Sequence, residues 1–257
     1  MSPSALTLAT AVVLCAALLR VGHAYSNATM YDCNADPHAY DNADVAFFTV
    51  LRAESAYVEE FVMYHLFIGV DVIYIYDNED EPTYRHLFPC NPRVKVVHFP
   101  WTPASRALVF KTLVLRHWME HFNHKHRFAM HIDGDDFVVL KQHTSVRDLA
   151  MEYLADPETS GVAGLALEWV RVGSGDRVYY EDKPLVTRFT GRALSNDRCI
   201  KTLFACDFAQ SFKDSHQVRT GRCELSHVVK VLHCAPAAVL RARGAVPYSP
   251  LCAARNP

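Results

Sequence analysis

Short hydrophobic runs rich in β-branched and aromatic residues alternate along this chain with longer stretches whose apolar residues recur at a helical period. The short runs predict strands over Val45–Leu51, Val72–Tyr76, Val94–Phe99, Phe128–Ile132 and Gly161–Trp169. The longer stretches predict amphipathic helices over Ser55–Ile68 and Ala104–Phe122. Strands and helices that alternate at this interval predict right-handed βαβ crossovers and a mainly parallel sheet flanked by helices.

The same pattern divides the chain into four parts. Residues 1–24 are mostly apolar, 25–44 form an N-terminal extension, 45–245 form one α/β domain, and 246–257 form a C-terminal tail. After residue 169 the periodicity becomes irregular. A length of 257 residues, half of them hydrophobic, fits one domain with a core of ordinary size.

The apolar N-terminus predicts entry into the secretory pathway. Ala5–Leu19 is shorter than the roughly 20 residues of a membrane span, and small residues precede a cleavage point after Ala24. We therefore expect a signal peptide. The alternative is an uncleaved type II anchor that keeps the protein associated with the membrane. Either route places the domain in the lumen of the ER or Golgi, or outside the cell. Asn27-Ala28-Thr29 is a glycosylation sequon that agrees with this compartment.

Cysteine usage supports an oxidising compartment. Seven cysteines follow the apolar N-terminus: Cys33, Cys90, Cys199, Cys206, Cys223, Cys234 and Cys252. We expect most of them to form disulfides and one to remain free, because the number is odd. The formal net charge of −2, with basic residues scattered along the chain, lacks the basic stripe of a nucleic-acid binder.

The strongest chemical signal is the sequence Asp133-Gly134-Asp135-Asp136, which follows a buried strand directly. Open α/β sheets bind ligands at the carboxyl ends of their strands, and carboxylates there suit a hard divalent cation. Magnesium and manganese usually keep only one or two protein carboxylates and complete their shell with water and phosphate oxygens. A calcium loop is excluded, because its sixth position would be Val138 instead of Gly and its twelfth Thr144 instead of Glu.

Several motifs in order resemble glycosyltransferase family 92 and the related family-2-like transferases. The matching segments are 49–54, 60–61, His65, 69–71, 73–78, 133–137, 169–175, 201–203, 232–233 and 241–244. Asp133–Phe137 is similar to the family's D-x-D-E-F, and Ile73–Asn78 to its I-Y-I-Y-D-N. The sequence departs from the family pattern at Ala53 for Asn, Asp136 for Glu, Val172 for Phe and Arg106 for Gln.

The resemblance implies a GT-A fold over residues 45–245, with the acceptor site in its irregular C-terminal part. It also implies a sugar transfer from a nucleotide-sugar, a UDP- or GDP-sugar, to a glycan acceptor, with Mn²⁺ or Mg²⁺ as cofactor. The metal ligands expected on this basis are Asp133, Asp135 and His233. The residues expected to bind the donor are Arg52, Glu54, Asp77, Asn78, Lys201 and His216.

Asp135 is expected to be catalytic through the metal, which stabilises charge on the departing diphosphate. An inverting reaction also needs a general base, and Glu168, Glu181, Asp182 and Asp214 are all eligible. We select Glu168 and Asp182, although a retaining reaction would need neither. Asp77 and Asn78 have an equally good interpretation as a polar turn after a buried strand.

Two other functions stay open at this point. The first is a secreted carbohydrate-binding protein that keeps the fold of a transferase and has lost turnover. The second is a secreted metal-dependent glycan hydrolase, for which paired carboxylates also suffice.

Overall fold

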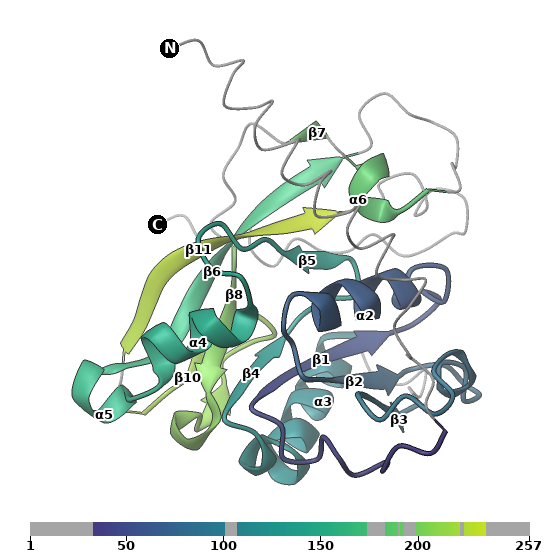
Figure 1. The fold of residues 1–257 in the computed structure, drawn as a ribbon, viewed down its shortest axis with the longest axis horizontal. Helices are drawn as coiled ribbons and strands as arrows, with labels where there is room; N and C mark the ends of the chain where they lie inside the picture. The colour runs from purple at the N-terminus through teal and green to yellow at the C-terminus, as the bar shows by residue number, and fades with distance from the viewer. Residues whose placement is uncertain are drawn as a thin grey trace.

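One large sheet with helices on both faces forms the centre of the molecule (Figure 1). The computed structural model describes residues 33–100, 107–173, 183–189, 191–192, 199–221 and 224–234. The strands are β1 (Val45–Leu51), β2 (Val72–Asp77), β3 (Val94–His98), β4 (Phe128–His131), β5 (Asp136–Val138), β6 (Val162–Gly173), β7 (Gly191–Arg192), β8 (Ile200–Ala205), β9 (Ser211–Phe212), β10 (Val218–Arg219) and β11 (Glu224–Cys234). The helices are α2 (Val58–Phe67), α3 (Ala107–His121), α4 (Val146–Leu154), α5 (Pro157–Ser160) and α6 (Leu185–Arg188), with short 3₁₀ turns η1 (Arg85–Leu87), η2 (Asn123–Lys125) and η3 (Cys206–Phe208).

The sheet is mixed but mostly parallel. Its strand order is β3-β2-β1-β4-β8-β6-β11-β5, and β7 pairs with β6. Strands β1 to β4 pair in parallel, and β8 runs antiparallel to both β4 and β6, so β6 and its parallel neighbour β11 point the same way as β4. The predicted α/β class with a mainly parallel sheet and flanking helices is therefore confirmed.

The five predicted strands and two predicted helices are all present, with ends that differ by a few residues. The sequence predicts an irregular region after residue 169, but β8 and β11 lie inside the sheet. Both strands escaped detection because polar residues interrupt them. Lys201 and Thr202 occupy buried positions in β8, and charged or polar residues recur along β11.

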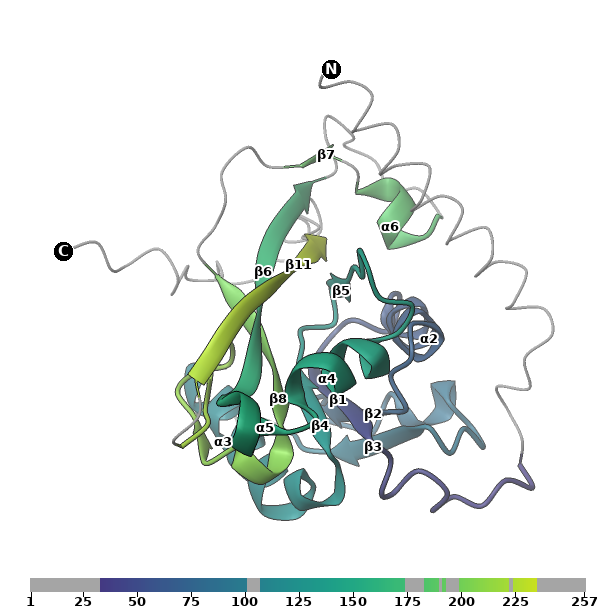
Figure 2. The same cartoon turned by 60° about the vertical axis from the view of Figure 1, so that its left-hand side comes forward.

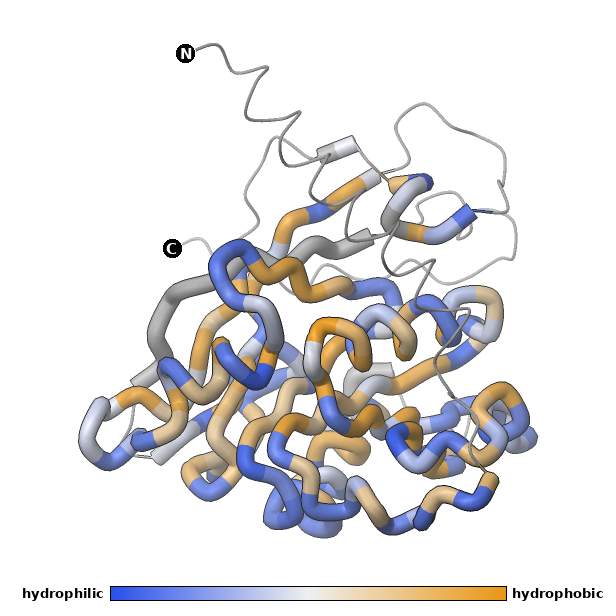
Figure 3. The backbone as a smooth tube through the Cα atoms, viewed as in Figure 1, coloured by the Kyte–Doolittle hydropathy of each residue, from blue (hydrophilic) through white to orange (hydrophobic). Residues whose placement is uncertain are grey.

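Successive residues of the central strands face two separate hydrophobic cores, as pleated strands require. Phe47 of β1 packs with the buried side chains of α2 and α4. Its neighbour Phe48 packs on the other face, where its ring stacks on Trp118 of α3 at a centroid distance of 4.1 Å. The two views of the ribbon show these helices on opposite sides of the strands (Figures 1 and 2). Hydrophobic segments concentrate around the strands, whereas the outer loops are mostly hydrophilic (Figure 3).

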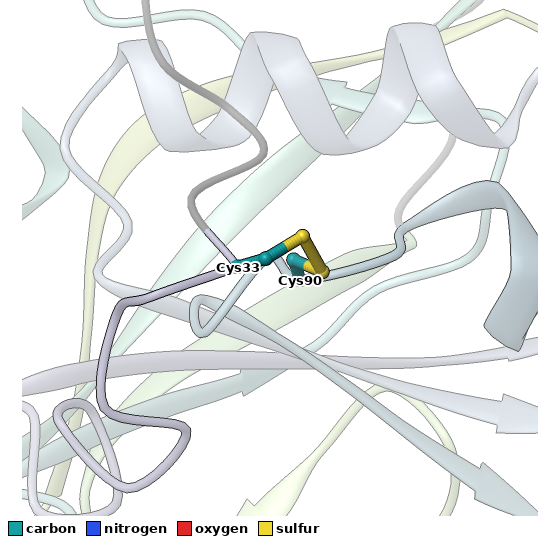
Figure 4. Close-up of a disulfide and its surroundings, with 2 residues drawn as sticks. All are labelled: Cys33 and Cys90. Atoms are coloured by element: carbon teal, nitrogen blue, oxygen red, sulfur yellow. A yellow bond between two sulfur atoms is a disulfide. The ribbon is translucent and has the colours of Figure 1, made fainter.

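A disulfide joins Cys33, ahead of β1, to Cys90 in the loop before β3 (Figure 4). Cys199 is also disulfide-bonded, and Cys206 is a buried free thiol. Within the part of the chain that the structure describes, no helix has the length and apolar character to cross a bilayer. The predicted signal peptide or anchor and the sequon at Asn27 lie outside that part.

Candidate functional site

The candidate site lies at the carboxyl ends of β1, β2 and β4, where the chain changes direction across the sheet. After β1 the chain builds β2 and β3 on one side, and it then returns to place β4 on the other side of β1. Such a switch point leaves a crevice between diverging loops and is the usual ligand site of open α/β sheets. Asp133–Asp136, called the carboxylate loop below, follows β4 at this edge.

Asp133 is held by two lysines from different elements. Lys111 of α3 donates from Nζ to Oδ1 at 2.8 Å, and Lys201 of β8 donates to Oδ2 at 2.6 Å. Burial opposes ionisation of this carboxyl, but Lys111 and then Lys201 hold its pKa well below the usual range. Asp133 is therefore a carboxylate throughout the physiological pH range.

Lys201 also binds Asp136, so one ammonium ties together both ends of the carboxylate loop. Its Nζ lies 3.2 Å from Oδ2 of Asp136, and neither side chain has solvent exposure. Trp169 of β6 donates from Nε1 to Oδ1 of the same carboxylate at 2.8 Å. Burial lowers the pKa of Lys201, but the two aspartates outweigh it and the net shift is upward. The carboxylate of Asp136 is thus held by Lys201 on one oxygen and by Trp169 on the other, which fixes the end of the carboxylate loop.

Gly134 allows Glu54 to pack directly on the carboxylate loop. A Cβ at position 134 would lie 2.3 Å from Oε2 of Glu54 and 2.5 Å from Cδ2 of Leu51, so a side chain here would force the contact apart. Burial, followed by the charges of Asp135 and Asp133, raises the pKa of Glu54 to about 8. Glu54 therefore keeps its proton at neutral pH unless another cation enters the site.

We expect Glu54→Gln to remove a pH dependence of folding stability. Between about pH 4.5 and 8 the native protein binds one more proton at Glu54 than the unfolded chain does. The free energy of unfolding of the wild type should therefore fall by roughly 1 kcal/mol for each unit by which the pH rises. The neutral glutamine should flatten this slope. Urea unfolding at pH 5, 7 and 9 measures it, with the exposed Glu59→Gln as a charge-matched control. Parallel curves for wild type and Glu54→Gln would contradict the assignment.

Two histidines, the buried His131 and the half-buried His216, flank the cluster in neutral form. Nδ1 of His131, on β4, lies 2.9 Å from the carbonyl oxygen of Ser215 and donates to it, while burial and then Lys201 lower the pKa of His131 to about 3. His216 lies 5.8 Å from the Trp169 ring, and burial and Lys201 lower its pKa too. Nε2 of His131 and Nδ1 of His216 have no hydrogen-bond partner among the described residues. Each offers a buried polar atom beside the site.

The predicted donor-binding residues of β1 and β2 form a connected pair of loops. Arg52 donates from Nη1 to the carbonyl oxygen of Asn78 at 3.1 Å. Both oxygens of the fully buried Asp77 accept backbone N–H groups, from Glu79 at 3.1 Å and from Thr83 and Tyr84 at 2.7 and 3.1 Å. This arrangement is the polar turn that the sequence left as an alternative for Asp77. Oδ1 of the buried Asn78 has no partner among the described residues.

The remaining predicted residues are Glu168, His233 and Asp182. Glu168 is exposed and precedes Trp169 on β6, so the two point to opposite faces of the strand. The backbone of His233 lies directly opposite Asp136 in the β11–β5 ladder, although its side chain is outside the described part. Asp182 also lies outside it.

Sequence reasoning missed Lys111 and His131. A signal for Lys111 was present, because it continues the stripe formed by Leu115, Trp118 and Phe122 at helical spacing, and a lysine on an inward-facing stripe needs a buried partner. His131 likewise interrupts an otherwise apolar strand.

The third carboxylate of the loop, Asp135, is partly buried, as is Asp133. Both oxygens of Asp133 and both oxygens of Asp136 are contacted by lysine or tryptophan. With Glu54 protonated, the three carboxylates of Asp133, Asp135 and Asp136 face two ammonium groups, which leaves one negative charge. A cation that displaced the proton of Glu54 would raise this excess to two, the charge that a divalent cation balances. In the described part of the chain no three His, Cys, Asp or Glu side chains surround a common metal position. Mg²⁺ and Mn²⁺ fit such a site with water and phosphate as further ligands.

Comparison with known proteins adds no family assignment. No family model matches the sequence, and no curated protein matches it significantly. The resemblance to glycosyltransferase family 92 therefore stays a prediction.

Proposed function

We propose that this protein is a metal-dependent glycosyltransferase of the GT-A type, which moves a sugar from a UDP- or GDP-sugar to a glycan acceptor in the secretory pathway. The observation that carries the proposal is the carboxylate loop at the switch point of a mostly parallel sheet, with an excess of negative charge beside the loops after β1 and β2. A diphosphate brought there alone would meet like charge, so a divalent cation has to accompany it.

Each part of the site has a distinct role in this proposal. The cation, when bound by Asp135, would stabilise negative charge on the departing diphosphate. Lys201 and Trp169 keep the loop rigid from below by fixing Asp133 and Asp136. Arg52 binds the backbone carbonyl oxygen of Asn78, and the side-chain amide oxygen of Asn78 is buried without a partner among the described residues. Polar groups of this kind suit the polar edge of a nucleoside.

The acceptor half of the reaction depends on residues that the sequence predicts. Glu168 and Asp182 remain candidates for the general base of an inverting transfer, and His233 remains a candidate metal ligand because its backbone pairs with Asp136. The Cys33–Cys90 disulfide supports an oxidising compartment, in agreement with a luminal or secreted transferase.

Calorimetric titration with UDP and GDP tests the donor site. We expect binding of one of them in the presence of Mn²⁺ and little or none in EDTA, because the cation bridges the diphosphate and the carboxylate loop. Equal affinity with and without the metal would count against the site.

A further inference from the structure

Helix α3 carries two histidines one turn apart, His117 and His121, whose rings are in contact. Their ring centroids are 4.3 Å apart, with an angle of 45° between the ring planes. Residues 117–121 read H-W-M-E-H, and the spacing H-x-x-E-H places two zinc ligands on one face of a helix in a class of metalloproteases. Two imidazoles on one tetrahedral zinc have ring centres roughly 5 Å apart, because each Zn–N bond is about 2 Å long. A small side-chain rotation therefore brings this pair to a chelating geometry.

A buried tyrosine orients one ring of the pair. The hydroxyl of Tyr76, on β2, lies 3.0 Å from Nδ1 of His117. Burial raises the pKa of Tyr76, so the phenol keeps its proton and its oxygen can accept a hydrogen bond from Nδ1–H. Metal-binding histidines are usually held in this way through the nitrogen that does not face the metal. In the part of the chain that the structure describes, Nε2 of His117 and both ring nitrogens of His121 have no hydrogen-bond partner.

Core packing accounts for His117 alone, but it does not account for the pair. The His117 ring contacts the rings of Phe99 and Phe122 at centroid distances of 5.3 and 5.6 Å, whereas His121 is exposed. Burial, followed by the charge of His121, lowers the pKa of His117, so its ring is neutral at pH 7. Neutral imidazole is the form that binds a metal. Two adjacent imidazoles oppose each other's protonation, whereas one divalent cation would bind both of them in the neutral form.

We propose that His117 and His121 form a binding site for Zn²⁺ or another late first-row divalent cation, separate from the carboxylate loop. Imidazole suits zinc, copper and nickel, and Mn²⁺ is the weakest binder of the series. Lys111, which contacts the carboxylate loop, lies earlier on α3, about 9 Å away along the helix axis. Among the described residues no third His, Cys, Asp or Glu joins the two histidines, so water would fill the remaining positions of the cation. This zinc site does not depend on the proposed function.

Calorimetric titration of the purified protein with Zn²⁺ tests the pair. We expect His121→Gln to weaken zinc binding by roughly a hundredfold or more, because the loss of an outer-shell partner alone costs about 10–100-fold. His121 is exposed, so the variant should keep the wild-type melting temperature in EDTA. The control is His124→Gln, which removes an exposed histidine on η2, just beyond the end of α3, and should leave the titration unchanged.

Tyr76→Phe tests the orienting role of the hydroxyl. Phenylalanine keeps the buried ring and deletes the group on Nδ1 of His117, so zinc should bind about tenfold more weakly. Melting curves in EDTA check that the variant is folded. Melting curves with added Zn²⁺ give a second measurement, because zinc raises the melting temperature only where the site is intact. We expect this rise in wild type and in His124→Gln, and none in His121→Gln.

Three outcomes would overturn the zinc site: no zinc binding by wild type, the same titration for wild type and His121→Gln, or an equal loss in His124→Gln. A titration with Mn²⁺ separates this site from the carboxylate loop. We expect wild type and His121→Gln to bind Mn²⁺ alike, because the histidine pair has little affinity for it. Loss of Mn²⁺ binding together with Zn²⁺ binding in His121→Gln would contradict two separate sites.

Discussion

Asp135→Asn is expected to lower sugar transfer by roughly a hundredfold or more while leaving the melting temperature unchanged. Asparagine keeps the size of the side chain but deletes the charge that would face the cation. The fold should tolerate the change, because Asp135 lies beside Asp133, Asp136 and Glu54 and its charge raises the pKa of Glu54. Loss of one negative charge relieves this repulsion. Turnover and thermal melting on the same preparation measure the two effects.

Asp136→Asn is the matched comparison within the same loop. Its carboxylate contacts Lys201 and Trp169, so the loss of its charge should lower the melting temperature. The turnover of the protein that remains folded should fall less than in Asp135→Asn. Full activity of Asp135→Asn, or activity lost only in step with stability, would show that the carboxylate loop is a structural turn.

Lys201→Met should produce the largest loss of stability, about 3–5 kcal/mol in the free energy of unfolding. The ammonium is fully buried between Asp133 and Asp136, and its removal leaves the buried Asp136 without its cation. Methionine matches the lysine stem in length, so the effect isolates the charge. Urea unfolding at neutral pH measures it.

Lys213→Met is the control for Lys201→Met, because Lys213 is exposed and its ammonium donates to the neutral Gln217 in the β9–β10 turn. The lysines lower the pKa of Asp133, so the stability from this pairing is present above the unfolded pKa and is lost as pH falls through the folded value. The difference between wild type and Lys201→Met should therefore shrink under acid conditions. A loss below about 1 kcal/mol at pH 7, the range of an exposed ion pair, would contradict this account.

Local patterns predict the first half of the fold well. Strands β1 to β4 and helices α2 and α3 have an apolar periodicity that few polar residues interrupt, and their alternation fixes which strand ends meet at one edge. The carboxylate loop was found in this way, because three aspartates within four residues after a buried strand are visible without any tertiary information.

The partners of that loop depend on pairings that are distant in sequence. Lys201 reaches Asp133 because β8 inserts between β4 and β6 against the direction of both, which no local pattern indicates. Trp169 and the backbone of His233 approach Asp136 through the same half of the sheet. A polar residue at a buried strand position shows that a partner is required, but the fold determines which one it is.

The loop after β2 shows the limit of motif reasoning on a single residue. Asp77 ends a strand at the ligand edge, where a donor-binding role and a turn-stabilising role use the same side chain. Three backbone N–H groups occupy its oxygens, while the amide oxygen of the neighbouring Asn78 has no partner among the described residues. Sequence alone weighs the two roles of Asp77 equally, because the path of the backbone decides between them.

Incubation of the purified protein with a panel of UDP- and GDP-sugars and Mn²⁺ tests the central claim most directly. Release of nucleoside diphosphate from one donor, by hydrolysis or by transfer to an added glycan, is expected in wild type and not in Asp135→Asn or in EDTA. Cleavage of intact glycans without any nucleotide would contradict the proposal and indicate a hydrolase. Glycan binding with no release from any donor would also contradict it and indicate a carbohydrate-binding protein.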